Sequence, residues 1–125
     1  MIKVLLVDDQ PAVRQGLRMR MELESDLAVV GEAASGLEAL NLAQRLGPDV
    51  IVMDVAMPEM DGITATEHLR EVVPLIPVVM LSIHGDGATR ARASAAGAAA
   101  FVEKQASVED LLCAIRRVAH RFTSK

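Results

Sequence analysis

The sequence predicts an α/β protein with a doubly wound, five-stranded parallel sheet. Short apolar runs rich in β-branched residues alternate five times with stretches of helical periodicity, which is the pattern of repeated strand and helix units. The runs are apolar at successive positions, which indicates strands that are buried on both faces. Four of the five runs end on a hydrophilic side chain. Because the carboxyl ends of parallel strands meet at one edge of the sheet, we expect a polar site there.

Residues 2–7 form the first predicted strand, which is apolar except for one lysine and ends on an acidic pair. Pro11 suits the first turn of a helix, where its missing N–H would be unpaired in any case. The apolar residues of this helix recur at four-residue spacing: Val13, Leu17 and Met21. The sequence therefore opens with one strand and helix unit.

Residues 27–33 predict the second strand. Ser35 and Glu38 have the spacing of a capping box, in which the serine caps the helix and the glutamate reaches back to the start of the same turn. Gly47 and Pro48 end that helix. The apolar residues expected for it are Leu37, Leu40 and Leu42.

The third predicted strand is a continuous apolar run, residues 50–53, that ends abruptly on Asp54. Turn-forming residues follow as far as Asp61 and Gly62, so the carboxylate should stand at the mouth of a crevice. A helix begins near Gly62 and stops before Pro74. Its apolar residues are Ile63, Ala65, Leu69 and Val72.

Residues 76–81 predict the fourth strand, which ends on Ser82. Asp86 is placed to cap a helix that reaches Ala96 and is closed by Gly97. The apolar face of this helix consists of alanines alone. Because so little apolar area anchors it, we expect its local stability to be low.

Residues 98–102 predict the fifth strand, which ends on Glu103 and Lys104, and Ser107 caps the last helix. The apolar stripe of that helix is formed by Val108, Leu111, Leu112, Ile115, Val118 and Ala119. Right-handed crossovers between five such strands leave few topologies. The flavodoxin-like strand order 2-1-3-4-5 is the leading one.

The chain of 125 residues has the size of one domain, which we expect to span residues 1–120, with 121–125 as a tail or the start of a linker. The formal charge is −4 and there is no basic run, which argues against direct nucleic-acid binding. The single Cys113 excludes an internal disulfide, and no leader follows Met1. No apolar stretch approaches the roughly 20 residues of a spanning helix. We therefore expect a cytoplasmic protein that makes no use of a membrane.

The hydrophilic residues at the ends of four predicted strands should converge on one edge: Asp8, Asp9, Asp54, Ser82 and Lys104. Three neighbouring carboxylates repel one another unless a cation lies among them, and hard oxygen ligands in an incomplete cage suit Mg²⁺. A lysine and a hydroxyl group supply the charge and the hydrogen bond that phosphoryl oxygens need. The pattern predicts a site that attaches a phosphoryl group to a carboxylate, with Asp54 as the candidate nucleophile.

The sequence strongly resembles the receiver (CheY-like) domain of two-component response regulators over residues 1–120. The motifs that carry the resemblance are Val7-Asp8-Asp9, residues 53–62, Leu81-Ser82, residues 97–101 and Glu103-Lys104. The amino-acid sequences of these motifs are most similar to those of the NarL/FixJ (LuxR-type) group, whose members usually carry a C-terminal helix-turn-helix domain. The resemblance implies a transcriptional regulator if such a domain follows residue 125; a single-domain regulator is the alternative.

For the site, the resemblance implies that Asp54 accepts a phosphoryl group from a sensor histidine kinase. Asp9, Asp54 and the backbone carbonyl of Ala56 would bind Mg²⁺, and Asp8 would assist through a metal-bound water. Such a domain is not a turnover enzyme. It would phosphorylate itself from a donor in the presence of Mg²⁺ and lose the group slowly.

The resemblance also implies that Ser82 and Lys104 contact the phosphoryl group and that Phe101 is the switch aromatic. We expect Phe101 to repack when the Ser82 hydroxyl is drawn toward the phosphoryl group. This would change the face formed by the fourth helix, the fifth strand and the fifth helix, and would favour partner binding or a homodimer. Arg14 and Arg18 lie one turn apart on the first helix. They form either part of a kinase-docking face or a solvated charge stripe.

Two positions depart from the family pattern. Ala56 is smaller than many residues found there, which bears on the access of water to the acyl phosphate. Gln105 follows Lys104 where many relatives have proline, and a cis bond without proline costs about 2.5–4 kcal/mol.

Three other functions fit the same fold. An enzyme that hydrolyses a small phosphate ester through an aspartyl phosphate needs an Asp-x-Asp pattern after the first strand, whereas this chain has adjacent aspartates. A flavin- or nucleotide-binding module needs a phosphate loop rich in glycine or serine at that place. A degenerate receiver would serve only as an interaction domain, although every acidic and basic position of the site is filled.

Overall fold

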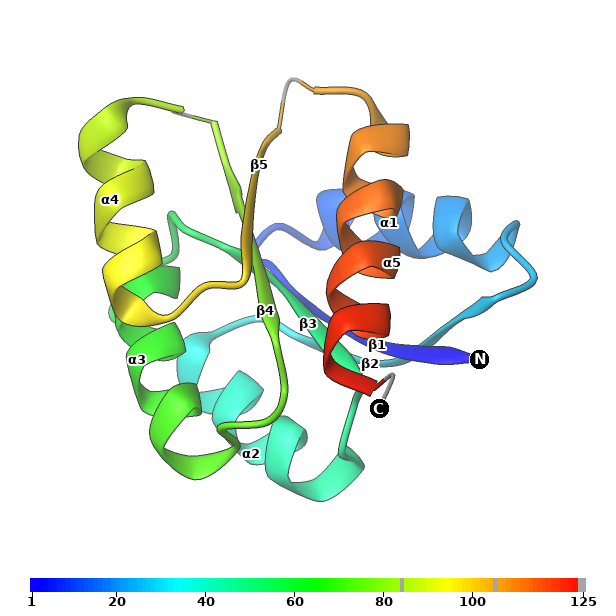
Figure 1. Cartoon of the computed structure of the whole chain (residues 1–125), viewed down its shortest axis with the longest axis horizontal. Coiled ribbons are helices and arrows are strands. Elements are labelled where there is room, and N and C mark those ends of the chain that lie inside the picture. Colours follow the sequence, from blue (N-terminus) through cyan, green and yellow to red (C-terminus); the bar gives the residue numbers. More distant parts are fainter. Residues whose placement is uncertain (84, 105, 124–125) are drawn as a thin grey trace.

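The computed structural model describes the backbone of residues 1–83, 85–104 and 106–123. Its centre is a sheet of five parallel strands in the order β2-β1-β3-β4-β5 (Figure 1). The strands are β1 (Ile2–Val7), β2 (Leu27–Ala33), β3 (Val50–Asp54), β4 (Val78–Ser82) and β5 (Ala100–Glu103). The predicted fold class and strand order are confirmed.

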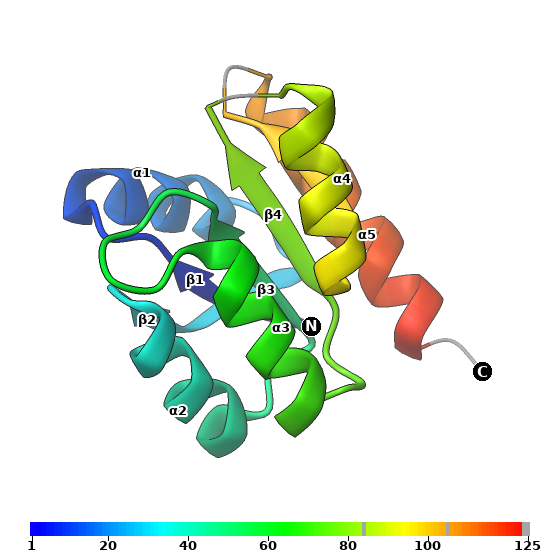
Figure 2. The ribbon, with the colours of Figure 1, turned by 90° about the vertical axis from the view of Figure 1, so that its left-hand side faces the viewer.

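Five helices alternate with the strands and cover both faces of the sheet. They are α1 (Pro11–Glu22), α2 (Gly36–Leu46), α3 (Gly62–Val72), α4 (Gly87–Ala96) and α5 (Val108–Thr123). Helices α1 and α5 pack on one face, and α2, α3 and α4 pack on the other, which is the face seen in Figure 2. Successive β1 side chains therefore enter different cores: Leu5 and Val7 face α2 to α4, whereas Val4 and Leu6 face α1 and α5.

The predicted helix caps are present. The Ser35 hydroxyl oxygen accepts from the Glu38 N–H at 3.2 Å. The Glu38 carboxylate reaches back as expected but accepts from the Ala34 N–H, at 2.6 Å, one residue before the N-cap N–H that a capping box uses. The Asp86 carboxylate accepts a 2.8 Å bond from a backbone N–H in the first turn of α4. Gly97 closes α4 at a φ of 104°, a left-handed conformation that suits glycine.

Two strands begin later than the sequence predicts. Strand β4 starts at Val78 because the chain is still turning at Ile76, whose N–H donates to the carbonyl of Val73 at 3.0 Å, and because Pro77 has no N–H to give. Strand β5 starts at Ala100 and runs through Glu103. Both strands also extend one residue further toward the polar edge than expected.

One leucine and one valine that the sequence assigned to apolar helix faces are exposed. Leu37 on α2 is 65% exposed, and Val72 at the end of α3 is 47% exposed. The inner face of α2 is instead formed by Ala39 and Ala43, which are fully covered. Small side chains suffice there because α2 lies close to α3: a Cβ built at Gly36 would lie 3.2 Å from the Ala65 methyl group.

Among the described residues, no helix is long and apolar enough to cross a bilayer. The peptide bond between Lys104 and Gln105, singled out in the sequence, lies outside the described residues.

Candidate acidic site at the carboxyl edge of the sheet

The acidic residues lie where β1 and β3 end side by side. These strands pair in parallel as far as Val7 and Met53, so the next residue of each chain segment, Asp8 and Asp54, reaches the same edge. Asp8 is 2% exposed and Asp54 is 3% exposed, whereas Asp9 is half-buried. The strand pairing thus forces two carboxylates into one sheltered space, as the sequence predicted.

One oxygen from each carboxylate of Asp8, Asp9 and Asp54 lies within 4.8 Å of the others. Three hard oxygen donors on one side of an open edge leave room for waters and for a further ligand, which is how proteins usually hold Mg²⁺. When all three are ionised, their mutual repulsion also favours a cation. The residues present therefore fit a magnesium ion.

Lys104 brings a positive charge to the same place from the end of β5. Its Nζ atom lies 3.2 Å from a carboxylate oxygen of Asp8 and 3.2 Å from one of Asp54. The backbone N–H of Lys104 donates to the carbonyl of Ser82 at 2.7 Å, which ties the start of the β5–α5 loop to the end of β4. The ammonium group thus bridges the two buried carboxylates.

Burial and the charge of Lys104 have opposite effects on the pKa of Asp54. Burial raises the pKa of its carboxyl group, and the negative charge of Asp8 adds to that rise, while Lys104 counteracts both. Burial alone would lower the pKa of Lys104, but the charges of Asp54 and Asp8 outweigh it, so the pKa of the ammonium lies above its ordinary value. The lysine therefore stays charged at neutral pH.

Ser82 and Ala56 flank the Asp54 carboxylate. Ser82 is the last residue of β4 and is buried, one position beyond Leu81, which pairs with Asp54. The N–H of Ala56 donates to a carboxylate oxygen of Asp54 at 3.3 Å, and Ala56 itself is exposed. The residues that the sequence assigned to metal and phosphoryl binding thus lie along one edge: Asp8, Asp9, Asp54, Ala56, Ser82 and Lys104.

The sequence did not reveal the part played by Gly62. A Cβ at this position would collide with the backbone carbonyl of Asp54, and the Gly62 N–H donates to the carbonyl of Val55 at 2.8 Å. The start of α3 is therefore pressed against the backbone of the candidate nucleophile. In the sequence, the pair Asp61-Gly62 indicates only a turn.

Arg14 and Arg18 of α1 both form ion pairs with the sheet. Arg14 and Arg18 donate to different oxygens of Glu32 on β2, at 3.1 and 2.6 Å. The Arg14 side chain is only 17% exposed, so the interpretation of both arginines as a solvated stripe is wrong for Arg14.

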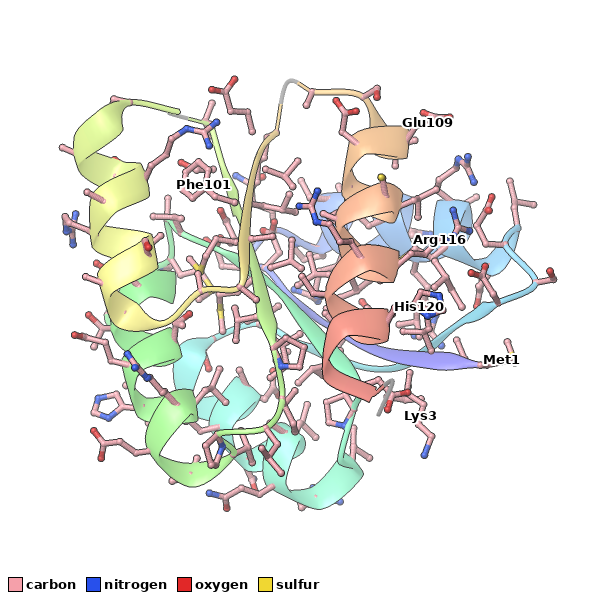
Figure 3. The ribbon with its side chains drawn as sticks, viewed as in Figure 1. Met1, Lys3, Phe101, Glu109, Arg116 and His120 are labelled. Atoms are coloured by element: carbon pink, nitrogen blue, oxygen red, sulfur yellow. The ribbon has the colours of Figure 1, made fainter. Side chains whose placement is uncertain are left out.

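Phe101 lies between β5 and α4 and is half-buried (Figure 3). The guanidinium carbon of Arg90, on α4, is 4.6 Å from the centre of the Phe101 ring, a cation–π contact. Arg90 also reaches Glu103 at 3.4 Å and the carbonyl of Gly85 at 3.2 Å. The ring is thus held to α4 by one side chain.

A family model and the curated relatives both identify this chain as similar to response regulators. A sequence model of the family described as "Response regulator receiver domain" matches residues 4–116. The response regulator protein VraR of Staphylococcus aureus is 41% identical over 118 residues, which are 94% of this chain and 56% of VraR. The chain therefore spans about half the length of the curated relatives it matches.

Solved structures of receiver domains superpose closely. A two-component response regulator of the LuxR family from Aurantimonas sp. SI85-9A1 gives a TM-score of 0.92 at 35% identity, over 95% of this chain and 85% of that one. The signal receiver domain of a NarL response regulator from Mycobacterium tuberculosis gives a TM-score of 0.89 at 32% identity, over 94% and 95% of the two chains.

Proposed function

This chain belongs to the response regulator receiver domain family, and from that membership we propose that it takes a phosphoryl group from a sensor histidine kinase onto Asp54. The observation that carries the proposal is the grouping of three carboxylates and one ammonium at a single edge, with Asp54 buried among them. The likeness to LuxR-family regulators supports a transcriptional role for the whole protein. Residues 1–120 would be its receiver domain, working in the cytoplasm.

In the transfer, a carboxylate oxygen of Asp54 attacks the phosphorus of the kinase phosphohistidine. A new O–P bond forms, the N–P bond breaks, and the electron pair returns to the imidazole ring. The fixed position of Asp54 at the end of β3 supports this role, because a rigid strand end holds the oxygen in place for in-line attack. The small donor acetyl phosphate would react in the same way, with acetate as the leaving group.

Asp9, Asp54 and the carbonyl of Ala56 would hold Mg²⁺, and Asp8 would bind one of its waters. When bound, the ion neutralises charge on the transferring phosphoryl oxygens. Asp8 would also have a second task, since one of its carboxylate oxygens lies 3.2 Å from the Lys104 ammonium. The buried aspartate would keep the lysine beside the place where the phosphoryl group arrives.

Lys104 and Ser82 would bind the phosphoryl oxygens. The ammonium already lies 3.2 Å from Asp54, so it needs only a small movement to follow negative charge onto the new group. The Ser82 hydroxyl would donate from the neighbouring strand end. Its displacement would free space for Phe101, repack the surface of α4 and β5, and favour homodimer formation.

The proposed chemistry is a single covalent modification rather than turnover, followed by slow hydrolysis of the aspartyl phosphate. Intact-mass measurement after incubation with acetyl phosphate tests it. We expect one added phosphoryl group on the wild type only when Mg²⁺ is present, and none on Asp54→Asn. A phosphoryl adduct that persists on Asp54→Asn contradicts the assignment of the acceptor, and rapid turnover of a phosphate ester would favour the hydrolase alternative.

A further inference from the structure

Arg14 lies on α1, but its guanidinium group reaches back to the acidic turn after β1. The Nη1 atom donates to the backbone carbonyl of Asp8 at 2.6 Å, and Nε donates to a carboxylate oxygen of Glu32 at 3.1 Å. The side chain is largely covered, so these bonds compete little with water. One arginine thus connects β2 to the turn that carries Asp8 and Asp9.

The carbonyl that Arg14 holds belongs to the peptide between Asp8 and Asp9. A peptide unit is planar and rotates as one body, so its orientation sets the direction in which the chain presents Asp9 relative to Asp8. The Asp8 carboxylate has its own supports, a 2.9 Å bond from the Gln10 N–H and the contact with Lys104. Arg14 controls the backbone between the two acids.

Glu32 fixes Arg14 in turn. It lies on β2 opposite Leu6 of β1, one residue before the strand ends, so its carboxylate is carried by the sheet. Its second oxygen accepts from Arg18 at 2.6 Å. Arg18 makes no contact with the acidic turn among the interactions of the described residues, and its other partner is Glu22.

We propose that Arg14 is a positioning residue for the metal site: by holding the peptide between Asp8 and Asp9, it aims their carboxylates toward Asp54. This inference rests on the proposed function, because it assumes that these carboxylates serve Mg²⁺. It is separable from a simple charge effect. Removing a positive charge beside three carboxylates should by itself strengthen cation binding, whereas losing the orientation of the turn weakens it.

Two variants with the same change of charge test the proposal, Arg14→Met and Arg18→Met. Calorimetric titration of the full chain with Mg²⁺ gives the dissociation constant. For Arg14→Met we expect the dissociation constant to rise about tenfold, the usual cost of losing a partner that orients a ligand. For Arg18→Met we expect it to change less than about twofold.

The rate of phosphorylation by acetyl phosphate, measured at increasing Mg²⁺ concentration, distinguishes a weaker metal site from a general loss of stability. For Arg14→Met we expect the Mg²⁺ concentration at half-maximal rate to rise, while the rate at saturating Mg²⁺ stays near that of the wild type. If Arg14→Met does not fold, Arg14→Lys serves, because lysine keeps the charge but lacks the planar pair of donors that reach Asp8 and Glu32 together. It should weaken Mg²⁺ binding by up to about tenfold, the lower end of the usual cost of losing an orienting contact.

Unchanged or tighter Mg²⁺ binding in Arg14→Met and Arg14→Lys overturns the proposal, as does an equal loss in Arg18→Met. A wild type that neither binds Mg²⁺ nor accepts a phosphoryl group would instead refute the proposed function itself, which separates the two failures.

Discussion

At the scale of single residues, the proposed role of Asp54 as the nucleophile brings two conflicting requirements. A nucleophile has to be ionised and sheltered from competing water, yet burial disfavours the ionised carboxylate. Lys104 favours the ionised form of Asp54, because its ammonium group lies 3.2 Å from carboxylate oxygens of both Asp54 and Asp8. Lys104 compensates only in part. Burial and the charge of Asp8 still hold the pKa of Asp54 above its ordinary value.

That raised pKa predicts that Asp54→Asn is more stable than the wild type in buffer with chelator at about pH 8. Because the folded-state pKa lies above that of the unfolded chain, the folded state holds the extra proton between the two values, and wild-type stability falls as the pH rises through that window. Melting temperatures of both proteins across this range provide the measurement. The advantage of Asp54→Asn should shrink as the pH falls toward about 3, below the pKa of the unfolded chain, where both states are mostly protonated. A difference that stays constant at every pH would show that the ionisation of Asp54 is not its cause.

Gly62 and Gly16 predict opposite effects of the same substitution. Gly62→Ala drives a methyl group into the carbonyl of Asp54, so we expect a loss of about 1–3 kcal/mol, the usual cost of overpacking. Gly16 lies in the middle of α1 with nothing within 4 Å of its added Cβ. Gly16→Ala should therefore gain about 0.5–1 kcal/mol from helix propensity. Urea unfolding of the two variants measures both, and equal effects would rule out the close approach at Gly62.

At the scale of elements, α4 and α5 differ most in how they are anchored. Only Ala93 and Ala96 of α4 are buried. The buried face of α5 adds four large aliphatic side chains to its buried alanines: Leu111, Leu112, Ile115 and Val118. Apolar area stabilises at about 25 cal/mol per Å², so α4 is the helix that opens at the lower cost.

Hydrogen exchange measures this difference directly. We expect amides of α4 (Gly87–Ala96) to exchange faster than those in the middle of α5, because local opening of α4 exposes little apolar surface. A phosphoryl mimic such as beryllofluoride should change protection in α4 and β5 and leave α5 less affected. Phe101→Ala is the control, and an unaltered response in that variant would remove Phe101 from the switch.

The sequence was sufficient to predict every strand and helix and to place the polar strand ends at one edge, because strand ends and helix caps have local sequence patterns. Asp54, Ser82 and Lys104 each follow an apolar run, and the parallel sheet brings such ends together. The exposure of Leu37 could not be predicted, since it depends on how closely α2 approaches α3. The bond from Arg14 to the Asp8 carbonyl was equally hidden, because no periodicity records which backbone oxygen a long side chain reaches.

At the scale of the whole molecule, Arg116 joins α5 to the turn before β2 (Figure 3). Its guanidinium donates to both carboxylate oxygens of Asp26, at 2.8 and 2.9 Å, and to Glu24 at 2.7 Å. Arg20 on α1 binds the other oxygen of Glu24 at 2.6 Å and Glu109 on α5 at 3.4 Å. The last helix is therefore tied to the first by a charge network as well as by apolar packing.

This network predicts acid sensitivity. The pKa of Glu24 is lowered by hydrogen bonds from Arg20 and Arg116, and the pKa of Asp26 is lowered by its bond from Arg116. Lowered pKa values mean that these carboxylates stabilise the fold above the unfolded-state pKa of about 4, and that this contribution disappears as the pH falls through the folded-state values. Arg116→Met should therefore reduce the melting temperature near neutral pH and much less in acid. Arg117→Met, an exposed neighbour on the same helix, is the matched control, and an equal loss in that variant would contradict the role of the network.

Met1, Ala119 and His120 line one hollow together with Asp26 and Asp49. Figure 3 labels Met1 and His120. Residues near the two ends of the described chain therefore lie beside each other, on the side of the sheet where β1 begins, and the acidic site lies where β1 ends. We therefore expect that a short linker can join the two ends of the described chain, and that the position of the break in the backbone has little effect on the acidic site. A circular permutant joined through a short linker and opened at the exposed turn by Leu75 should still assemble the same acidic pocket and accept a phosphoryl group on Asp54.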